Sequence, residues 1–267
     1  CTYIFEVWQR PTDMTEWISS PEIAGNDPNW VSNLRSLLSE KQWSVELKDI
    51  VSKLGNGQRL SLSDGHILYH HSSLYEVGQL ANLVKIARYG KHVFFNSNVH
   101  INQTNICVLA CKFCAFRRSK KQTDAYELSI ENYLEEMAKF STSIDEVHSV
   151  GGLHPDWDVN FYVDLISAAK EKFPEISIKA LTAVEIKHLS QQSGITFTET
   201  LTQLRNAGLD SLPGGGAEIL NDSIREIICN GKESSDEYLE IHRQAHSLGI
   251  PSNCTMLFGT IESINDR

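Results

Sequence analysis

The 267-residue sequence predicts an α/β fold whose strands form a parallel sheet, and two observations lead to this prediction. From about residue 93 onward, short apolar segments alternate with segments of helical periodicity, which is the pattern of strands joined by helical crossovers. Two of the apolar segments, DEVHSVGG and LDSLPGGG, run into glycines, as strands do where they enter a loop. The length also suits a single α/β barrel, which commonly has roughly 250 residues.

The elements of this α/β part can be placed one by one. Strands are predicted at about 93–101, 146–150, 176–182, 209–212 and 251–258. Helices, in which apolar residues recur at three- and four-residue intervals, are predicted at 129–140, 160–173, 198–207 and 235–248. Pro174 and Gly208 end two of these helices, and Ser234 with Glu237 forms a capping box at the start of the last one.

The number of strands bears on how the sheet closes, because a barrel normally needs eight. Either the sheet is open, or the chain carries only about five βα units of a barrel. We expect the second arrangement, and therefore that these 267 residues are part of a longer protein. A sheet that stopped here would leave its fifth strand with an unpaired edge.

A separate, partly helical N-terminal extension is predicted over residues 1–57, and the barrel domain over residues 58–267. The first thirty or so residues mix proline, glycine, asparagine and aspartate without a period, which is typical of a linker. Apolar residues then recur at roughly helical spacing between residues 31 and 54. A clearer helical stripe, which Gly90 ends, is formed by Leu80, Leu83, Val84 and Ala87.

Composition and charge exclude several classes of protein. Hydrophobic residues make up 41% of the sequence and charged residues 22%, as in ordinary globular proteins. The net charge of −10 argues against nucleic-acid binding, which needs a dense field of Lys and Arg. No apolar run approaches the roughly 20 residues of a membrane span, and no signal peptide is visible. We therefore expect a cytoplasmic protein without a membrane or nucleic-acid partner.

Three of the six cysteines, Cys107, Cys111 and Cys114, fall within eight residues and have the spacing C-x3-C-x2-C. Three thiolates on one loop can hold three irons of a 4Fe–4S cluster and leave the fourth iron open for a small molecule. The alternative is a non-catalytic zinc module completed by a histidine, Cys229 or Cys254. Zinc sites usually pair two short Cys-x-x-Cys hairpins, and the sequence has no second one.

The cysteine loop, with Phe113 between its last two cysteines, resembles that of the radical S-adenosylmethionine (SAM) superfamily. Further blocks between about residues 58 and 263 narrow the resemblance to the aminodeoxyfutalosine synthase family, which acts on the futalosine route to menaquinone. These blocks are HINQTNICVLACKFCAFRR, VHSVGGLHPD, IKALTAVEI, GLDSLPGGGAEIL, EIHRQAHSLGI and SNCTMLFG. Two sister families, the dehypoxanthine futalosine cyclases and the FO synthase subunits, share much of this pattern.

The resemblance implies a TIM-type radical SAM barrel, a 4Fe–4S cluster and SAM consumed as a co-substrate. The implied reaction joins the deoxyadenosyl group of SAM to the small molecule 3-[(1-carboxyvinyl)oxy]benzoate. Its products are aminodeoxyfutalosine, bicarbonate and methionine. A low-potential electron donor such as flavodoxin or ferredoxin is the implied protein partner.

The resemblance also assigns residues to SAM. Phe113 is expected near the adenine, with plain anchoring of the loop as the alternative. Gly151 and Gly152 are expected beside the methionine part, because glycine lets the backbone approach a ligand closely. Glu185 is expected on the ribose hydroxyls, and the alternative is an acidic residue that favours the first turn of a helix.

The substrate carries two carboxylates, and the candidates for binding them are of two kinds. Gly214 and Gly215, followed by Glu218, are expected to open a helix and to present backbone amides to an anion. Arg117 and His154 are candidates for a direct contact with a carboxylate, although Arg117 could equally lie in solvent. No residue is assigned a catalytic role by the sequence.

Overall fold

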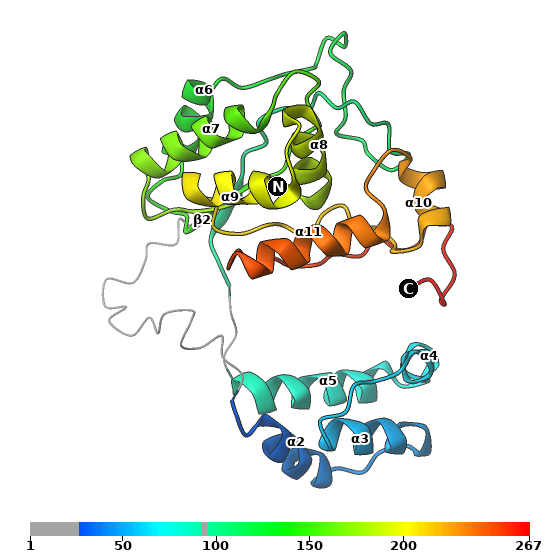
Figure 1. Ribbon diagram of the computed structural model, residues 1–267. Coiled ribbons are helices and arrows are strands. Elements are labelled where there is room, and N and C mark those ends of the chain that lie inside the picture. The colour runs from blue at the N-terminus through cyan, green and yellow to red at the C-terminus, as the bar shows by residue number, and fades with distance from the viewer. Residues whose placement is uncertain (1–26, 92–94) are drawn as a thin grey trace, which may run out of the picture. The chain divides into compact units, whose positions relative to one another are not determined.

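The computed structural model describes residues 27–91 and 95–267, which form two compact units (Figure 1). The first unit is helical and ends at Phe95, and the second is the α/β unit that begins at Asn96. The predicted linker over the first residues lies outside the described residues, apart from its last few positions.

The helical unit consists of α2 (Trp30–Ser39), the short 3-10 helix η1 (Val45–Leu47), α3 (Lys48–Gly55), α4 (Leu62–His70) and α5 (Leu74–Tyr89). Its core joins leucines of α2 to the predicted stripe of α5. The buried members are Leu34, Leu38, Leu47, Ile50, Leu80, Leu83 and Ala87. The described residues 58–91, which the sequence placed with the barrel, therefore belong to the helical unit, because α5 buries its apolar side against α2.

Asp64 at the start of α4 gives this unit a pH dependence. Its carboxylate accepts hydrogen bonds from the Lys53 ammonium at 2.8 Å and from the Ser61 amide at 2.7 Å. These contacts, with that from Lys53 first, lower the pKa of Asp64 from 3.8 to about 2.

A depressed carboxyl pKa stabilises the folded state above the unfolded pKa, and this contribution disappears as the pH falls through the folded pKa. Stability supplied by Asp64 should therefore be complete above about pH 3.8 and lost towards about pH 2. Urea unfolding of the wild-type protein should show a steeper loss of stability in this range than unfolding of Asp64→Asn. Equal pH dependence in the two proteins would contradict this assignment.

The α/β unit is built on three parallel strands, β1 (Asn98–His100), β2 (Glu146–Ser149) and β3 (Ser177–Ala180), which lie side by side in chain order. Single parallel bridges extend this order, from Lys179 to Ser211 and from Leu212 to Ser252. The predicted strands at 209–212 and 251–258 are thus reduced to isolated bridges. Pro213 explains part of this, because a residue without an N–H cannot continue the ladder after Leu212.

Helices connect these strands, as the sequence predicted. The unit contains α6 (Ile130–Ala138), α7 (Val159–Lys172), α8 (Ala183–Ser193), α9 (Phe197–Ala207), α10 (Asp222–Cys229) and α11 (Ser235–Ser247). α6, α7, α9 and α11 agree with the four predicted helices to within a few residues, whereas α8 and α10 were not predicted. No closed barrel is present among the described residues, although the parallel strands in sequential order agree with a barrel wall.

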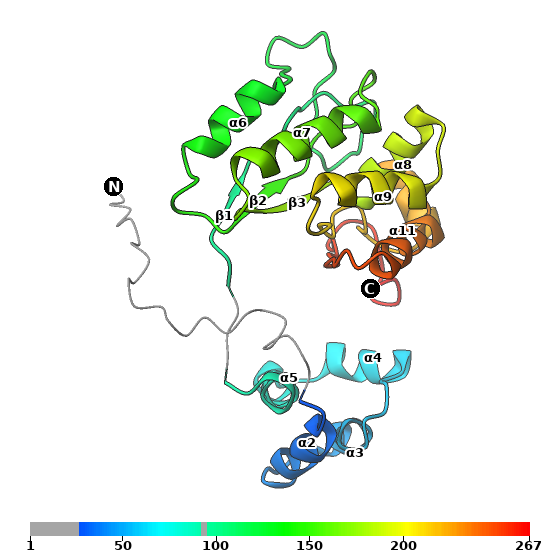
Figure 2. The ribbon, with the colours of Figure 1, turned by 60° about the vertical axis from the view of Figure 1, so that its left-hand side comes forward.

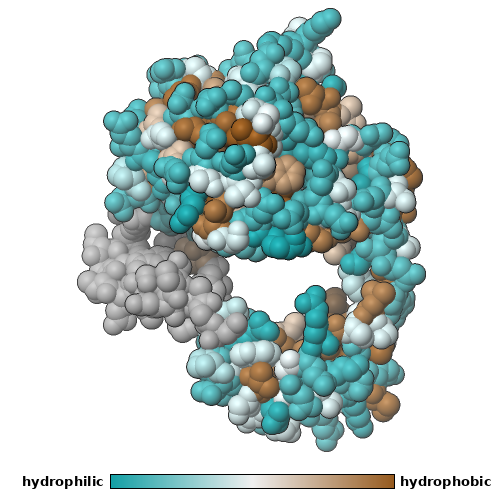
Figure 3. Space-filling view, in the orientation of Figure 1, coloured by the Kyte–Doolittle hydropathy of each residue, from teal (hydrophilic) through white to brown (hydrophobic). Residues whose placement is uncertain are grey.

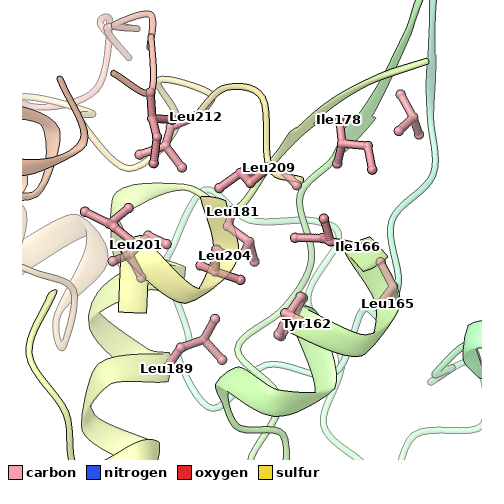
Figure 4. Packing of buried hydrophobic residues seen from close by; sticks show 14 of the residues in the cluster. Tyr162, Leu165, Ile166, Ile178, Leu181, Leu189, Leu201, Leu204, Leu209 and Leu212 are labelled. Atoms are coloured by element: carbon pink, nitrogen blue, oxygen red, sulfur yellow. The ribbon is translucent and has the colours of Figure 1, made fainter. Parts of the chain in front are cut away.

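One large apolar core lies between the sheet and the helices. Val147 and Ile178 of the strands are buried in one cluster with residues of α6 and α7. These two helices cover one face of the sheet (Figure 2). Leu201 and Leu204 of α9 extend the same core beside Leu181 (Figure 4). The outer surface shown in Figure 3 mixes hydrophilic and hydrophobic residues. Within the described residues, every helix is too short or too polar to span a bilayer.

Candidate functional site

The cysteine loop follows β1 and is fixed by backbone hydrogen bonds to three other segments. The amide of Cys107 donates to the Arg118 carbonyl at 3.0 Å, and the amide of Val108 donates to the Leu153 carbonyl at 3.0 Å. Lys112 donates to the carbonyl of Ile228 in α10 at 2.8 Å. The loop is therefore held against the segment after β2 and against α10, where all three of its thiols are free.

The three thiols line one cavity of about 200 Å³. Its other walls come from the rest of the cysteine loop and from the segments that follow β2, β3, the bridge at Leu212 and α10. These residues are Leu109, Phe113, Phe116, Arg117, Val150, Gly151, Gly152, Leu153, Thr182, Val184, Gly215, Gly216 and Lys232. The cavity thus lies where ligands bind in parallel α/β folds, beyond the carboxyl ends of the strands.

Gly151 and Gly152 are required where the segment after β2 meets the cysteine loop. A Cβ on Gly152 would collide with the carbonyl of Ile106 and would lie 3.0 Å from the Cβ of Cys107. A Cβ on Gly151 would collide with the side-chain amide of Gln103. Both glycines also line the cavity. The structure thus shows a close approach of these glycines to the segment that leads into the cysteine loop, and the expected approach to SAM stays a prediction.

The glycine stretch after Leu212 does not open a helix, so that prediction is wrong. α10 begins only at Asp222, and the chain before it turns through positive φ values of 96° at Gly216 and 43° at Glu218. Gly214 is buried against the backbone of Asn253 and Cys254, and it does not line the cavity. Gly215 does line it, but as part of a turn and without a helix terminus behind it.

The thiol chemistry fits an iron–sulfur cluster. Burial raises the pKa of Cys111 to about 11, and the nearby Lys232 ammonium opposes this effect. Metal binding must therefore displace a proton at Cys111, as it does at other thiol ligands. Within residues 27–91 and 95–267, no three His, Cys, Asp or Glu side chains converge as the ligands of a single ion would. A 4Fe–4S cluster does not require the three thiols to converge on one point, because each cysteine binds a different iron.

The family model described as the radical SAM superfamily matches residues 101–267, which include the cysteine loop and every wall of the cavity. The chain belongs to the radical SAM superfamily. Members of this superfamily use a 4Fe–4S cluster and SAM, and the free thiols and glycine-lined walls of the cavity fit these two groups.

Curated relatives of this radical SAM chain have different names. The chain is 40% identical to an aminodeoxyfutalosine synthase from Thermus thermophilus over 82% of its length and 59% of the relative's. It is 37% identical to a 5-amino-6-(D-ribitylamino)uracil–L-tyrosine 4-hydroxyphenyl transferase from Methanopyrus kandleri, over 72% and 52% of the two lengths. It is 34% identical to a cyclic dehypoxanthine futalosine synthase from Streptomyces coelicolor, over 84% and 57%. The chain thus spans between half and two thirds of these relatives.

A solved structure supports the radical SAM fold. The chain superposes on HydG, a maturase of the [FeFe]-hydrogenase, with a TM-score of 0.65 and 17% identity, over 90% of this chain and 52% of that one. At this identity the similarity supports the fold alone.

Glu185 is fully engaged by protein donors in this radical SAM site. Its carboxylate accepts hydrogen bonds from the Gly151 amide at 3.0 Å and from the amide and hydroxyl of Thr182, both at 2.7 Å. Burial raises the pKa of Glu185, although these hydrogen bonds oppose the shift. The side chain caps α8 and does not line the main cavity. Of the two interpretations of Glu185, this geometry favours an acidic residue in the first turn of a helix. The hydrogen bond from the Gly151 amide also connects the segment after β2 to α8.

His154 also lies outside the main cavity. Its Nδ1 accepts the Asp156 amide at 3.2 Å, so its Nε2 carries the proton that points to the Glu127 carboxylate at 2.7 Å. Its ring stacks on Trp157 with 4.3 Å between centroids. The imidazole thus has protein partners on both nitrogens and on one face.

Arg117 and Phe113 both line the cavity, and their expected contacts with a carboxylate and with the adenine stay predictions. The Arg117 Nε donates to the Cys107 carbonyl at 3.3 Å, and within the part of the chain that the structure describes its guanidinium has no acidic partner. Of the five residues proposed for substrate, Arg117 is therefore the one with an uncompensated charge at the cavity.

Lys232 is a cavity residue that the sequence analysis missed. Its ammonium pairs with the Glu218 carboxylate and lies 5.6 Å from the centre of the Phe113 ring. Burial would lower the pKa of Lys232, but the charges of Glu218 and Cys111 outweigh burial and raise it. Glu218 is therefore neutralised by Lys232. Nothing local marks this lysine in the sequence, since only the tertiary fold brings it to the cysteines.

A buried ion pair fixes the turn that carries Gly216 and Lys232. The Arg225 guanidinium donates to the Gly216 carbonyl at 3.0 Å and binds the Glu233 carboxylate at 3.0 Å. Both side chains are almost fully buried. This wall of the cavity therefore depends on one arginine.

Replacing Arg225 by Met should lower the free energy of unfolding by about 3–5 kcal/mol, because it leaves the charge of Glu233 buried and unpaired. Arg243→Met on α11 removes an arginine whose ion pair with Glu240 is exposed, and it should change stability by only about 0.5 kcal/mol. Urea denaturation of both variants measures the difference. Similar stability of the two variants would show that the buried pair does not hold this wall.

Proposed function

We propose that this chain belongs to a radical SAM transferase that joins the deoxyadenosyl group of SAM to 3-[(1-carboxyvinyl)oxy]benzoate. Three free thiols on one wall of a cavity beyond the strand ends carry the proposal, together with the similarity to an aminodeoxyfutalosine synthase. The products would be aminodeoxyfutalosine, bicarbonate and methionine. The carbon–sulfur bond of SAM breaks, a carbon–carbon bond forms at the alkene, and water is taken up as the carboxylate leaves.

In this proposal Cys107, Cys111 and Cys114 hold three irons of the cluster. When bound, the cluster supplies the electron that cleaves SAM. Gly151 and Gly152 leave room beside the cysteines for the methionine part of SAM, because no side chain projects there. Phe113 and Phe116 give the cavity part of its apolar lining. Glu185 holds the Gly151 amide in place, which makes it a positioning residue in this account.

Arg117 is the residue that we assign to a substrate carboxylate, because its charge at the cavity is uncompensated. Addition to an alkene requires the acceptor carbon to sit beside the deoxyadenosyl group, so positioning is the main contribution of the protein. We assign no substrate contact to His154, Gly214 or Glu218, since their polar or backbone partners belong to the protein itself.

Radical SAM enzymes act on small molecules and need a reductant. For this protein we propose flavodoxin or ferredoxin as the electron donor. The free cysteines and the oxygen-sensitive cluster fit a cytoplasmic location.

The test is anaerobic turnover of the reduced protein with SAM and 3-[(1-carboxyvinyl)oxy]benzoate, analysed by mass spectrometry. Formation of aminodeoxyfutalosine with methionine supports the proposal. Parallel reactions contain dehypoxanthine futalosine, or tyrosine with 5-amino-6-(D-ribitylamino)uracil, because relatives named for these chemistries have similar identity. If product forms in only one of those parallel reactions, this chain belongs with the relatives that are named for that reaction. A colourless protein that holds zinc would support the non-catalytic alternative.

A further inference from the structure

The face of the sheet opposite α6 and α7 carries a row of basic side chains. The strand register aligns His100 with His148, and His148 with Lys179. Side chains alternate between the two faces of a strand, so this row lies on the face opposite Val147 and Ile178, which are buried in one cluster with residues of α6 and α7. In a barrel this is the inner face.

The three side chains have no polar protein partner among the described residues. The rings of His100 and His148 are 4.3 Å apart and tilted by 30°, and neither forms a hydrogen bond there. Lys179 forms no ion pair in the same part of the chain, and its side chain is half-buried. Burial, the charge of His100 and that of Lys179 lower the pKa of His148 to about 4. At neutral pH the row therefore offers a neutral imidazole beside an ammonium.

Among the described residues of β1, β2 and β3, one acidic group shares this face, and it lies further from the cavity. Glu146 precedes His148 by two residues, and its carboxylate accepts a hydrogen bond from the Asn98 amide at 3.5 Å. Towards the cavity, Val150 follows His148 by two residues and Thr182 follows Lys179 by three. At about 3.3 Å per residue, the row lies roughly 7–10 Å below the cavity wall.

We propose that His100, His148 and Lys179 bind the ring carboxylate of an aromatic carboxylic acid substrate. This inference rests on the proposed function, in which the substrate is a benzoate with an enolpyruvyl group. The alkene must lie at the cysteine cavity, so the ring carboxylate points away from the thiols, along the inner face of the strands. An ammonium with two imidazoles complements a carboxylate there, although the whole protein has a net charge of −10.

The inference is tested by calorimetric titration of the protein with isophthalate, a stable aromatic dicarboxylate. Lys179→Met should weaken isophthalate binding about tenfold, because a charged hydrogen-bond donor is lost. Lys179→Arg should restore most of the affinity, since it restores the charge. Lys172→Met, which removes an exposed lysine of α7, is the matched control and should bind as the wild type does. Circular dichroism checks that each variant is folded.

Wild-type affinity in a folded Lys179→Met variant would overturn the inference, and so would a wild-type protein that does not bind isophthalate. The turnover experiment is separate from this titration. If no aminodeoxyfutalosine forms but isophthalate binding depends on Lys179, the proposed function fails and the carboxylate site stands. If product forms with an unchanged KM in Lys179→Met, the function stands and the site is wrong.

Discussion

Alanine in place of Cys107, Cys111 or Cys114 should abolish iron retention and SAM cleavage. Each thiolate is assigned to a different iron, and the loop between residues 107 and 114 contains no spare cysteine. The measurement is the iron and sulfide content per chain after anaerobic reconstitution, followed by quantification of methionine released from SAM. We expect about four irons in the wild-type protein and close to none in each variant.

Cys229 and Cys254 provide the controls for this experiment. Cys254 is exposed, whereas Cys229 is buried in a small apolar cluster against which Cys111 packs. Cys229 thus belongs to the cluster against which a proposed ligand packs, and Cys229→Ala is the sharper control. Both alanine variants should keep nearly all of their iron. Loss of iron from either one would show that the ligand set is wrong.

Alanine in place of Gly152 should have the second largest effect. Its Cβ would collide with the carbonyl of Ile106, which is backbone and has no freedom to rotate away. The loop after β2 and the cysteine loop must separate, so we expect a loss of about 2–4 kcal/mol in unfolding free energy and poor cluster retention. Thermal unfolding and iron content measure the two effects.

Gly78→Ala is the matched control for this substitution. Gly78 lies within α5, and a Cβ there would meet no atom within 4 Å. Alanine should stabilise that helix by about 0.5–1 kcal/mol. If Gly152→Ala unfolds no earlier than wild type, the close packing of the two loops has no energetic role.

The spacing of apolar residues was sufficient to predict the helices that have one clearly apolar side. α11 begins where the capping box predicts, and the Ser234 hydroxyl accepts the Glu237 amide at 3.1 Å. α8 was not predicted as an element, because its first residues continue the apolar run of β3, although one interpretation of Glu185 already placed it in the first turn of a helix. The strand in fact ends at Ala180, since Leu181 adopts a positive φ of 64° and Thr182 then caps the helix.

The cavity could be predicted only in part from the sequence. The cysteine spacing and the glycine pairs are local signals, and they identify the two loops that meet at the cavity. Lys232 and its partner Glu218 carry no local signal, because their pairing depends on the turn that Arg225 holds. The glycine stretch at 214–216 was misassigned for a related reason. Glycine permits a helix start and a tight turn alike, and here packing against Asn253 selects the turn.

The central claim is that the three thiols hold a cluster with one iron open to SAM. Electron paramagnetic resonance of the anaerobically reconstituted and reduced protein, recorded with and without SAM, tests it most directly. The account predicts the signal of a reduced 4Fe–4S cluster whose g values shift when SAM binds to the open iron. A cluster signal that SAM leaves unchanged, or a reconstituted protein that contains zinc in place of iron, would contradict it.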